Sequence, residues 1–443
     1  MTDKKKETPV NNSRRFFIKQ SATALAGFII VPRFVLGGKR PDGSKYIPPS
    51  DMISLGFIGC GKQGPLLMNY FLNTNEVKIV ALSEVYKDKS QLMLQKIKLY
   101  QQQTNQPVNS KDISVYNDFR ELLARKDIDA VVIATPDHWH AAVAVRAAEA
   151  GKDIYCEKPM SLTVKEGRAM VKATRKHNRV FQTGNMQRSW PEFRQAVELV
   201  RNGYIGEIKN IKVNVGPPPV AYNLPEQPVP AGLDWMQWLG PNEYKPFNAE
   251  LAPPVTKDVY PNWRNYKEFG GGMVTDWGAH MFDIAQWALD MDNSGPVKLF
   301  APDKDHPYLT YEYENGVIMT HEKWEWNNAV LFTGSEGEIR IQRGKLETTP
   351  ATLMNKIIGK NEKHVYKSEN HYLDFLNAIR KRSKPISDVE VGHRTASVCN
   401  IGNIAYELKR SLRWDPVKEN FKDDHEANKL LGRKMLNEWK IKL

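Results

Sequence analysis

The chain lacks the cysteine patterns of disulfide frameworks and zinc sites. Its 443 residues include three cysteines, at positions 60, 156 and 399, and no Cys-X-X-Cys pair. Isolated cysteines with this spacing are typical of packed thiols. His138 and His140 flank a tryptophan on an expected loop, so they do not share one helical face. We therefore predict no metal site.

Concentrated basic charge is also missing from most of the chain. The net charge is +12, but the first 40 residues hold nine basic and two acidic side chains, which leaves +5 for all the others. A nucleic-acid-binding surface needs a patch or stripe of Lys and Arg. We predict no nucleic-acid partner.

Long apolar runs are absent, and the one near the N-terminus is modest. Arg14 and Arg15 precede an apolar stretch over 22–31 that Pro32 ends. This stretch is too short for a membrane-spanning helix, which needs roughly 20 residues. Paired arginines before a short apolar region look like a twin-arginine export signal. We expect residues 1–38 to be that signal, with no stable membrane span and export to the periplasm; a basic amphipathic arm is the alternative.

The apolar content of the chain, 41%, is sufficient for the hydrophobic cores of two domains. Short apolar strands alternate with helical segments over residues 51–185, which predicts a doubly wound parallel sheet of the Rossmann type. From there to residue 443 the strands follow one another as meanders, and we predict an α+β domain, 186–443, with a largely antiparallel sheet. Its tail is expected to end in a helix over 426–439.

A glycine fingerprint follows the first expected strand, 52–58. The spacing of Gly59, Gly61 and Gly64 fits GxGxxG, in which the three glycines permit a tight turn, the approach of a pyrophosphate and close helix packing. Phosphate then lies at the N-terminus of the next helix. The residues predicted to bind a dinucleotide here are Gly59, Gly61, Lys62, Gln63 and Gly64. A glycine-rich turn without a ligand remains the alternative.

An acidic residue ends the second expected strand, 77–82. Glu84 stands twenty positions after Gly64, where a carboxylate binds the adenosine ribose hydroxyls. The same carboxylate repels a 2′-phosphate, so NAD is favoured over NADP, although Lys62 and Lys87 could weaken that preference. A solvated loop glutamate is the alternative.

Two further segments carry acid–base chemistry. Lys158 follows a strand expected over 153–156, at the edge of the sheet where ligands bind. Asp276 and His280 stand four residues apart, a spacing that places both on one face of a helix, where the carboxylate can hold the imidazole. A histidine can accept a hydroxyl proton near neutral pH. The alternative is a capped helix with an ordinary core histidine.

Taken together, these motifs resemble the Gfo/Idh/MocA (glucose-fructose oxidoreductase/inositol dehydrogenase) family, and in particular an exported branch with a Bacteroidetes-type C-terminal domain. The resemblance covers roughly residues 13–443. Besides the paired arginines, it is carried by the runs 59–64, 135–140, 157–159, 233–241, 270–280, 334–337 and 391–394.

The resemblance implies a role for each matching residue. Lys158 would contact the nicotinamide ribose and the reacting hydroxyl, His280 would be the general acid/base, and Asp276 would orient the substrate or His280. Glu157 would bind the nicotinamide-side ribose. The remaining cofactor contacts would come from Thr135, Pro136, His140, Asn185 and Gln187. The family often has aspartate where this chain has Glu84, which leaves the cofactor preference less secure.

Aromatic side chains point to a carbohydrate substrate. Aromatic faces suit the C–H faces of sugars. The candidates for substrate contact are Arg188, Trp190, Trp263, Arg264 and Trp277. Core packing is the alternative for the tryptophans. We also expect a homo-oligomer, a dimer or tetramer, in which the second sheet could serve as the interface.

Three functions remain open. The first is an NAD-dependent dehydrogenase acting on a ring hydroxyl of a sugar or glycoside. The second is a glycosidase or lyase that oxidises its substrate transiently with bound NAD. The third is a non-catalytic protein that binds NAD or a ligand, because a fold alone does not imply a function.

Overall fold

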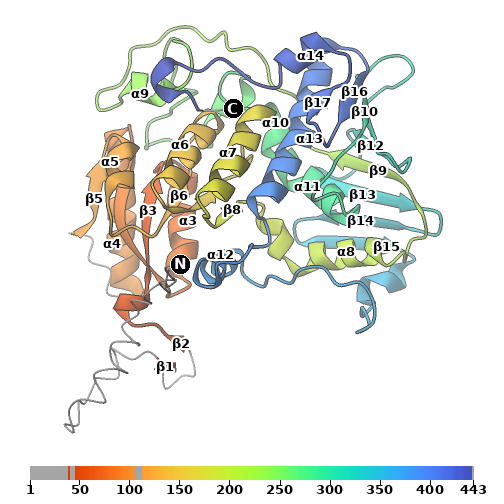
Figure 1. The fold of residues 1–443 in the computed structure, drawn as a ribbon, viewed down its shortest axis with the longest axis horizontal. Coiled ribbons are helices and arrows are strands. Elements are labelled where there is room, and N and C mark those ends of the chain that lie inside the picture. Colours follow the sequence, from red (N-terminus) through yellow and green to blue (C-terminus); the bar gives the residue numbers. More distant parts are fainter. Residues whose placement is uncertain (1–37, 40–44, 105–111, 442–443) are drawn as a thin grey trace, which may run out of the picture. The chain divides into compact units, whose positions relative to one another are not determined.

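The computed structural model describes residues 38–39, 45–104 and 112–441 (Figure 1). The chain divides into two units, 1–52 and 53–443. In the first, β1 (Gly38–Lys39) pairs antiparallel with β2 (Lys45–Tyr46), and a 3-10 helix spans Pro49–Asp51. The paired arginines and the apolar stretch of the expected export signal lie outside the described residues, so export stays a prediction.

The second unit opens with a six-stranded sheet in which every neighbouring pair is parallel. Its strand order is β5-β4-β3-β6-β7-β8. The strands are β3 (Ile53–Ile58), β4 (Val77–Ser83), β5 (Ser114–Tyr116), β6 (Ala130–Ile133), β7 (Asp153–Cys156) and β8 (Phe181–Thr183). This is the order of a dinucleotide-binding fold, and ligands bind beyond the carboxyl ends of the strands where β3 meets β6.

Helices cover both faces of this sheet. They are α3 (Gln63–Leu72), α4 (Lys87–Thr104), α5 (Phe119–Ala124), α6 (Asp137–Glu149) and α7 (Val164–Lys176). One face packs against α3 and α4, and the other against α5, α6 and α7. Because apolar side chains fill both sides, every residue of the central strand β3 is buried.

The C-terminal region forms a second sheet of nine strands. Its order is β15-β14-β13-β9-β12-β11-β10-β16-β17, and the pair β9 and β12 is parallel while the other pairs are antiparallel. The strands are β9 (Ile208–Asn214), β10 (Lys298–Phe300), β11 (Leu309–Glu312), β12 (Ile318–His321), β13 (Ala329–Gly334), β14 (Glu338–Gln342), β15 (Lys345–Thr349), β16 (Leu412–Asp415) and β17 (Asn420–Phe421). The predicted fold class is confirmed.

The remaining described helices follow β8 in the chain. They are α8 (Pro191–Arg201), α9 (Trp235–Leu239), α10 (Gly272–Asp276), α11 (Gly278–Ala288), α12 (His371–Lys381), α13 (Val389–Leu408) and α14 (His425–Lys429). Short 3-10 helices span Met186–Ser189, Asn262–Asn265, Ala351–Asn355 and Asn437–Trp439. Helix α13 packs on both α7 and α11, and Phe375 of α12 lies in the core of the first sheet (Figure 1). The end of the chain therefore returns to the N-terminal domain.

Three local predictions were wrong. The expected loop around His138 and His140 is the first turn of α6, because Pro136 ends the extended segment and Asp137 opens the helix. The expected tail helix over 426–439 is interrupted: it is reduced to α14 and a terminal 3-10 helix. The single helix expected to hold Asp276 and His280 breaks at Trp277 into α10 and α11.

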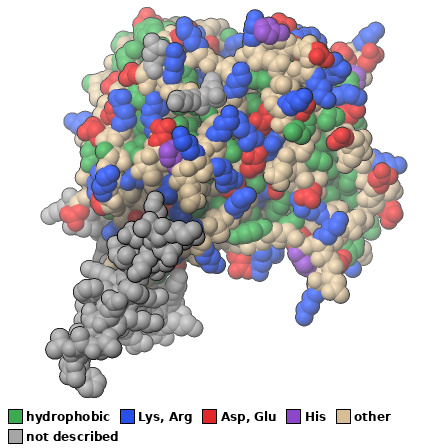
Figure 2. Space-filling model, in the orientation of Figure 1, with side chains coloured by type: hydrophobic (Ala, Val, Ile, Leu, Met, Phe, Trp, Pro, Cys, Tyr) green, Lys and Arg blue, Asp and Glu red, His purple; other side chains and the backbone are tan. Residues whose placement is uncertain are grey.

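None of the described helices combines the length and the apolar character needed to cross a membrane. Among the same residues, no three His, Cys, Asp or Glu side chains are placed to share a metal ion. Lys and Arg are interspersed with Asp and Glu on the face seen in Figure 2.

Candidate active site

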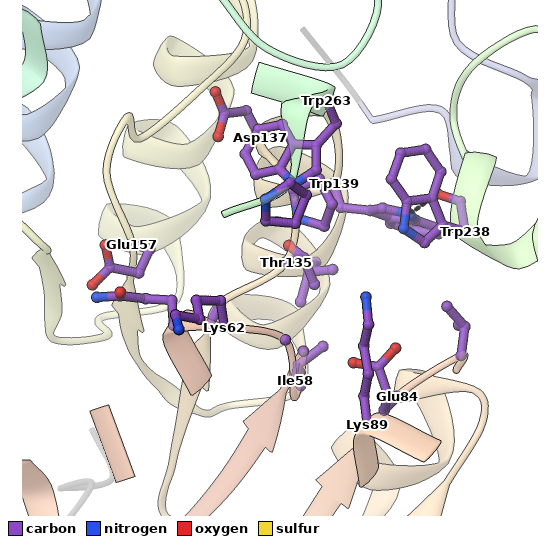
Figure 3. Close-up of a pocket in the computed structure, with 18 of the residues that line it drawn as sticks. Ile58, Lys62, Glu84, Lys89, Thr135, Asp137, Trp139, Glu157, Trp238 and Trp263 are labelled. Carbon is purple, nitrogen blue, oxygen red and sulfur yellow. Dashed lines mark hydrogen bonds between the residues drawn. The ribbon is translucent and has the colours of Figure 1, made fainter. Parts of the chain in front are cut away.

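A pocket lies beyond the carboxyl ends of the parallel strands (Figure 3). Glu84 and Lys89 lie on one side of it in this view, Lys62 and Glu157 lie on the other, and Thr135 stands between them. The predicted site residues that line it are Gly59, Gly61, Lys62, Gln63, Glu84, Thr135, Pro136, Glu157, Lys158, Trp263, Arg264 and Asp276. Residues from both domains therefore form one pocket.

The three fingerprint glycines have three different environments. A Cβ on Gly59, whose φ is +93°, would lie 2.7 Å from the backbone of Ala134. A Cβ on Gly64 would lie 2.7 Å from the carbonyl oxygen of Gly59, because α3 begins against the turn. A Cβ on Gly61 would meet no atom within 4 Å. The turn is thus tight at two glycines and open at the one where a pyrophosphate would approach.

Glu84 braces this turn. Its carboxylate accepts hydrogen bonds from the backbone N–H of Cys60 at 2.7 Å and of Tyr86 at 2.9 Å. Lys89 lies beside it, and burial lowers the pKa of Lys89 although Glu84 opposes that shift. The carboxylate is thus held at the end of β4, in the pocket, where the adenosine ribose was predicted to bind.

Several polar atoms near the pocket are buried without a protein partner. Among the described residues these atoms include Oγ1 of Thr135, Oε1 of Glu157, Oδ1 of Asn185 and Nδ1 of His280. Burial raises the pKa of Glu157 to about 7, although the neighbouring Lys158 opposes the shift. Such groups are costly unless something binds them. Together with the open Gly61, they fit a nicotinamide dinucleotide extended across the strand ends.

Lys158, Asp276 and Arg264 form one charged cluster. The Nζ of Lys158 donates to Oδ1 of Asp276 at 2.8 Å and to its backbone carbonyl at 3.0 Å. Arg264 donates to the other carboxylate oxygen at 3.3 Å. Burial opposes ionisation of Asp276, but the two cations hold its pKa below the usual value. Lys158 is thereby held in a fixed position at the edge of the pocket.

His280 is buried and neutral. Burial, with the nearby charges of Lys158 and Arg343, lowers its pKa well below the usual value. The Nη2 atom of Arg343 lies 3.0 Å from its Nε2. A guanidinium can only donate, so Nε2 accepts and the ring proton lies on Nδ1. The imidazole is therefore in the form that can accept a proton from a hydroxyl.

Arg343 was not predicted as a site residue. It occupies the two-residue turn between β14 and β15, and its guanidinium lies 4.6 Å from the ring centre of Trp277 and 5.4 Å from that of Trp190. It also donates to Oε1 of Gln187 at 3.2 Å. The Arg-Gly pair predicts a turn between strands, but nothing near it in the sequence indicates that the turn reaches a histidine 63 positions earlier.

Other predicted residues have structural partners. The ring nitrogens of His140 lie 2.8 Å from the carbonyl oxygen of Pro159 and 3.0 Å from that of Thr135. Burial lowers the pKa of His140 to about 4, so the neutral ring has one N–H and donates to one of these two carbonyls. Asn185 donates to the carbonyl of Ala279 at 2.7 Å, directly before His280. Gly64 lets the start of α3 pack closely against the backbone of the turn.

Two predicted roles do not fit the geometry. Arg188 is 1% exposed and pairs with Asp283 at 2.8 Å and Asp292 at 2.7 Å, so its guanidinium is committed to the interior and not to a substrate. Asp276 binds Lys158 and makes no hydrogen bond to His280 within the described part of the chain, so of its two predicted roles the one toward His280 does not fit.

Comparison with known proteins agrees with this architecture. A model described as the NAD-binding Rossmann fold of the oxidoreductase family matches residues 53–185, and one described as the C-terminal alpha/beta domain of that family matches residues 220–441. The uncharacterised oxidoreductase YrbE of Bacillus subtilis is 24% identical over 379 residues, which cover 82% of this chain and 95% of YrbE.

Two other similarities are narrower. A glycosyl hydrolase family 109 protein of Shewanella baltica is 30% identical over 216 residues, which cover 45% of this chain and only 44% of that protein. The structure of a levoglucosan dehydrogenase, in complex with NADH and levoglucosan, matches with a TM-score of 0.57 and 20% identity over 82% of this chain and 99% of that structure, a likeness in fold.

The matched models cover both domains in the order in which the structure forms them. The N-terminal match contains the glycine turn, Glu84 and Lys158, and the C-terminal match contains Asp276, His280 and Arg343. The chain therefore belongs to the Gfo/Idh/MocA family of oxidoreductases, whose N-terminal domain binds a nicotinamide cofactor.

Proposed function

We propose that this protein is an NAD-dependent dehydrogenase that oxidises a ring hydroxyl of a sugar or glycoside. The observation that carries the proposal is a fixed lysine at the strand ends whose charge acts on a neutral histidine in α11. Lys158 is held by Asp276 at 2.8 Å, and the buried imidazole of His280 lies near enough for the lysine to lower its pKa.

These residues suit the removal of a hydroxyl proton. Negative charge grows on the substrate oxygen as the proton leaves, and the ammonium of Lys158 can stabilise it. Nε2 of His280 can accept the proton once the guanidinium of Arg343 no longer occupies it. Asp276 keeps Lys158 in place. The nicotinamide cofactor, when bound, supplies the hydride acceptor.

The finer features of the proposal rest on individual residues. Glu84 favours NAD over NADP, because a carboxylate at the end of β4 would repel a 2′-phosphate. Trp277, whose ring centre lies 5.6 Å from that of His280, and Trp190, which lies beside Arg343, are the aromatic candidates for contact with a sugar ring. Export by the twin-arginine route to the periplasm would require a tightly retained cofactor, regenerated by a second, carbonyl substrate. A homo-oligomer remains part of the proposal.

Replacement of Lys158 with alanine tests the proposal. We expect the variant to retain the dinucleotide but to lose turnover, because the cation that stabilises the developing charge is gone. The assay follows absorbance at 340 nm and the loss of two hydrogens from the sugar by mass spectrometry, over a panel of glycosides. Lys165→Ala, in α7, is the matched control. Normal turnover by Lys158→Ala would refute the assignment.

A glycosidase that oxidises its substrate transiently is the second candidate. It is favoured by the similarity to glycosyl hydrolase family 109 proteins, although that similarity covers less than half of each chain. The same mass measurement separates the two functions. A glycosidase releases the aglycone without a lasting change at 340 nm, whereas a dehydrogenase leaves an oxidised sugar. Binding of NAD without either product would instead favour a ligand-binding protein.

A further inference from the structure

Arg343 differs from the other cations of its hairpin in having no carboxylate partner among the described residues. Arg340, on β14, pairs with Glu338 and Glu325, and Lys345, on β15, pairs with Glu347 at 2.8 Å. Arg343 stands between them at the turn and reaches inward. Its only hydrogen-bond partners in the described part of the chain are Gln187 and His280, and both bind through Nε or Nη2. The Nη1 edge of the guanidinium is left for a ligand.

Three side chains, those of Trp190, Trp277 and Gln187, hold the guanidinium of Arg343 in place. The rings of Trp190 and Trp277 both lie within cation–π distance of it, and the amide oxygen of Gln187 accepts from it at 3.2 Å. Although Arg343 as a residue is exposed, its head group thus reaches the buried His280. A guanidinium ordered in this way loses little conformational freedom when it binds a planar anion.

The charge near the reacting region also favours an anion. Lys158 and Arg264 pair with the carboxylate of Asp276, and Arg343 adds a third cation beside His280. Burial raises the pKa of Asp137, another carboxyl group that lines the pocket, and so disfavours its charged form. Glu157 has a pKa of about 7 because of its burial, so it is only partly ionised at neutral pH. The pyrophosphate of a dinucleotide would lie at the glycine turn and would not neutralise this group. A neutral sugar would leave the excess positive charge uncompensated.

We propose that Arg343 binds a carboxylate group of the substrate, so that the protein oxidises a sugar acid, a glycuronic acid or glycuronide, in preference to a neutral sugar. The proposal rests on the dehydrogenase function and names its substrate class. The planar fork of the guanidinium matches the two oxygens of a carboxylate. When the carboxylate accepts from Nη1 and Nη2, Nη2 leaves Nε2 of His280. Substrate binding thereby frees the base that accepts the hydroxyl proton.

The test compares methyl glucoside, galactoside and mannoside with the corresponding methyl glycuronides, which differ from them at C6. Oxidation by the holoenzyme is followed by product mass, and kcat/KM is determined for each pair. We expect at least one glycuronide to be preferred over its neutral partner by about 10- to 100-fold, the value of a charge-assisted hydrogen-bond pair. A preference for every neutral sugar, or for the 6-O-sulfate of the same sugar over its glycuronide, would overturn the proposal.

Arg343→Gln and its neighbour Arg340→Gln separate anion binding from an effect on the base. The first variant should reduce the ratio of kcat/KM between glycuronide and neutral sugar to near one, whereas the second should preserve the ratio. If Arg343 acts only through His280, its loss slows both sugars equally and the ratio stays the same, which would refute substrate binding.

A binding measurement keeps this proposal separate from the proposed function. If no sugar is oxidised, the dehydrogenase assignment fails, but quenching of tryptophan fluorescence by the glycuronides still reports on Trp190 and Trp277 beside the guanidinium. Saturable quenching that is lost in Arg343→Gln would support the anion site. No glycuronide binding by the wild type would reject it.

Discussion

Replacement of Gly61 with alanine separates cofactor binding from folding. The added Cβ would meet no protein atom within 4 Å, and Gly61 does not have the left-handed backbone conformation that alanine avoids. The substitution should therefore leave the fold intact and stabilise it slightly, by about 0.4–1 kcal/mol, since alanine restricts the unfolded chain. The open space around Gly61 is where a pyrophosphate would approach.

We expect Gly61→Ala to weaken binding of the dinucleotide. A methyl group at this position would push the phosphate away from the backbone N–H groups of the turn. Loss of one charge-assisted hydrogen bond costs about 1.5–3 kcal/mol, which corresponds to about 10- to 100-fold weaker binding. Gly59→Ala is the contrasting variant, because its φ of +93° and a Cβ 2.7 Å from Ala134 should disturb the fold itself.

The assay combines two measurements on cofactor-free protein. Urea unfolding gives the stability of each variant, and isothermal titration calorimetry gives the dissociation constant for NAD. We expect Gly61→Ala to unfold at the wild-type urea concentration or slightly above it, with weaker binding, and Gly59→Ala to unfold earlier. Wild-type affinity in Gly61→Ala would refute the placement of the pyrophosphate over this glycine.

Three further predictions concern single residues. Glu157→Gln should remove a pH dependence of stability. The folded pKa of Glu157, about 7, lies above its unfolded value near 4.5, so the cofactor-free wild type should lose about 3 kcal/mol of stability as the pH rises between these values. The variant should not lose it, and urea unfolding at pH 5 and pH 8 measures the difference. Glu84→Ala should lower the ratio of the dissociation constants for NADP and NAD, because the carboxylate that repels a 2′-phosphate is gone and Lys89 remains; an unchanged ratio in titration calorimetry would reject the role of Glu84. Arg188→Met should lower the melting temperature sharply, since it leaves Asp283 buried without its cation at a cost of about 3–5 kcal/mol; stable protein with altered substrate preference would instead restore Arg188 to the substrate site.

Some features of this protein follow from short stretches of sequence. The glycine turn, the strands on either side of it and the position of Glu84 depend on spacings within about one βαβ unit, for which local pattern is informative. Lys158 was placed at a strand end by the same reasoning, and the structure puts it in the pocket.

The tertiary structure alone decided which side chains meet. Asp276 and His280 are four positions apart, yet the helix breaks between them and the carboxylate binds Lys158 from the other domain. Arg188 follows the strand ends in sequence, but two aspartates from the C-terminal domain hold it in the interior. Arg343 reaches His280 because a hairpin of the second sheet ends beside α11. Contacts of this kind depend on how elements that are distant in sequence pack together, and the spacing of residues along the chain does not predict that packing.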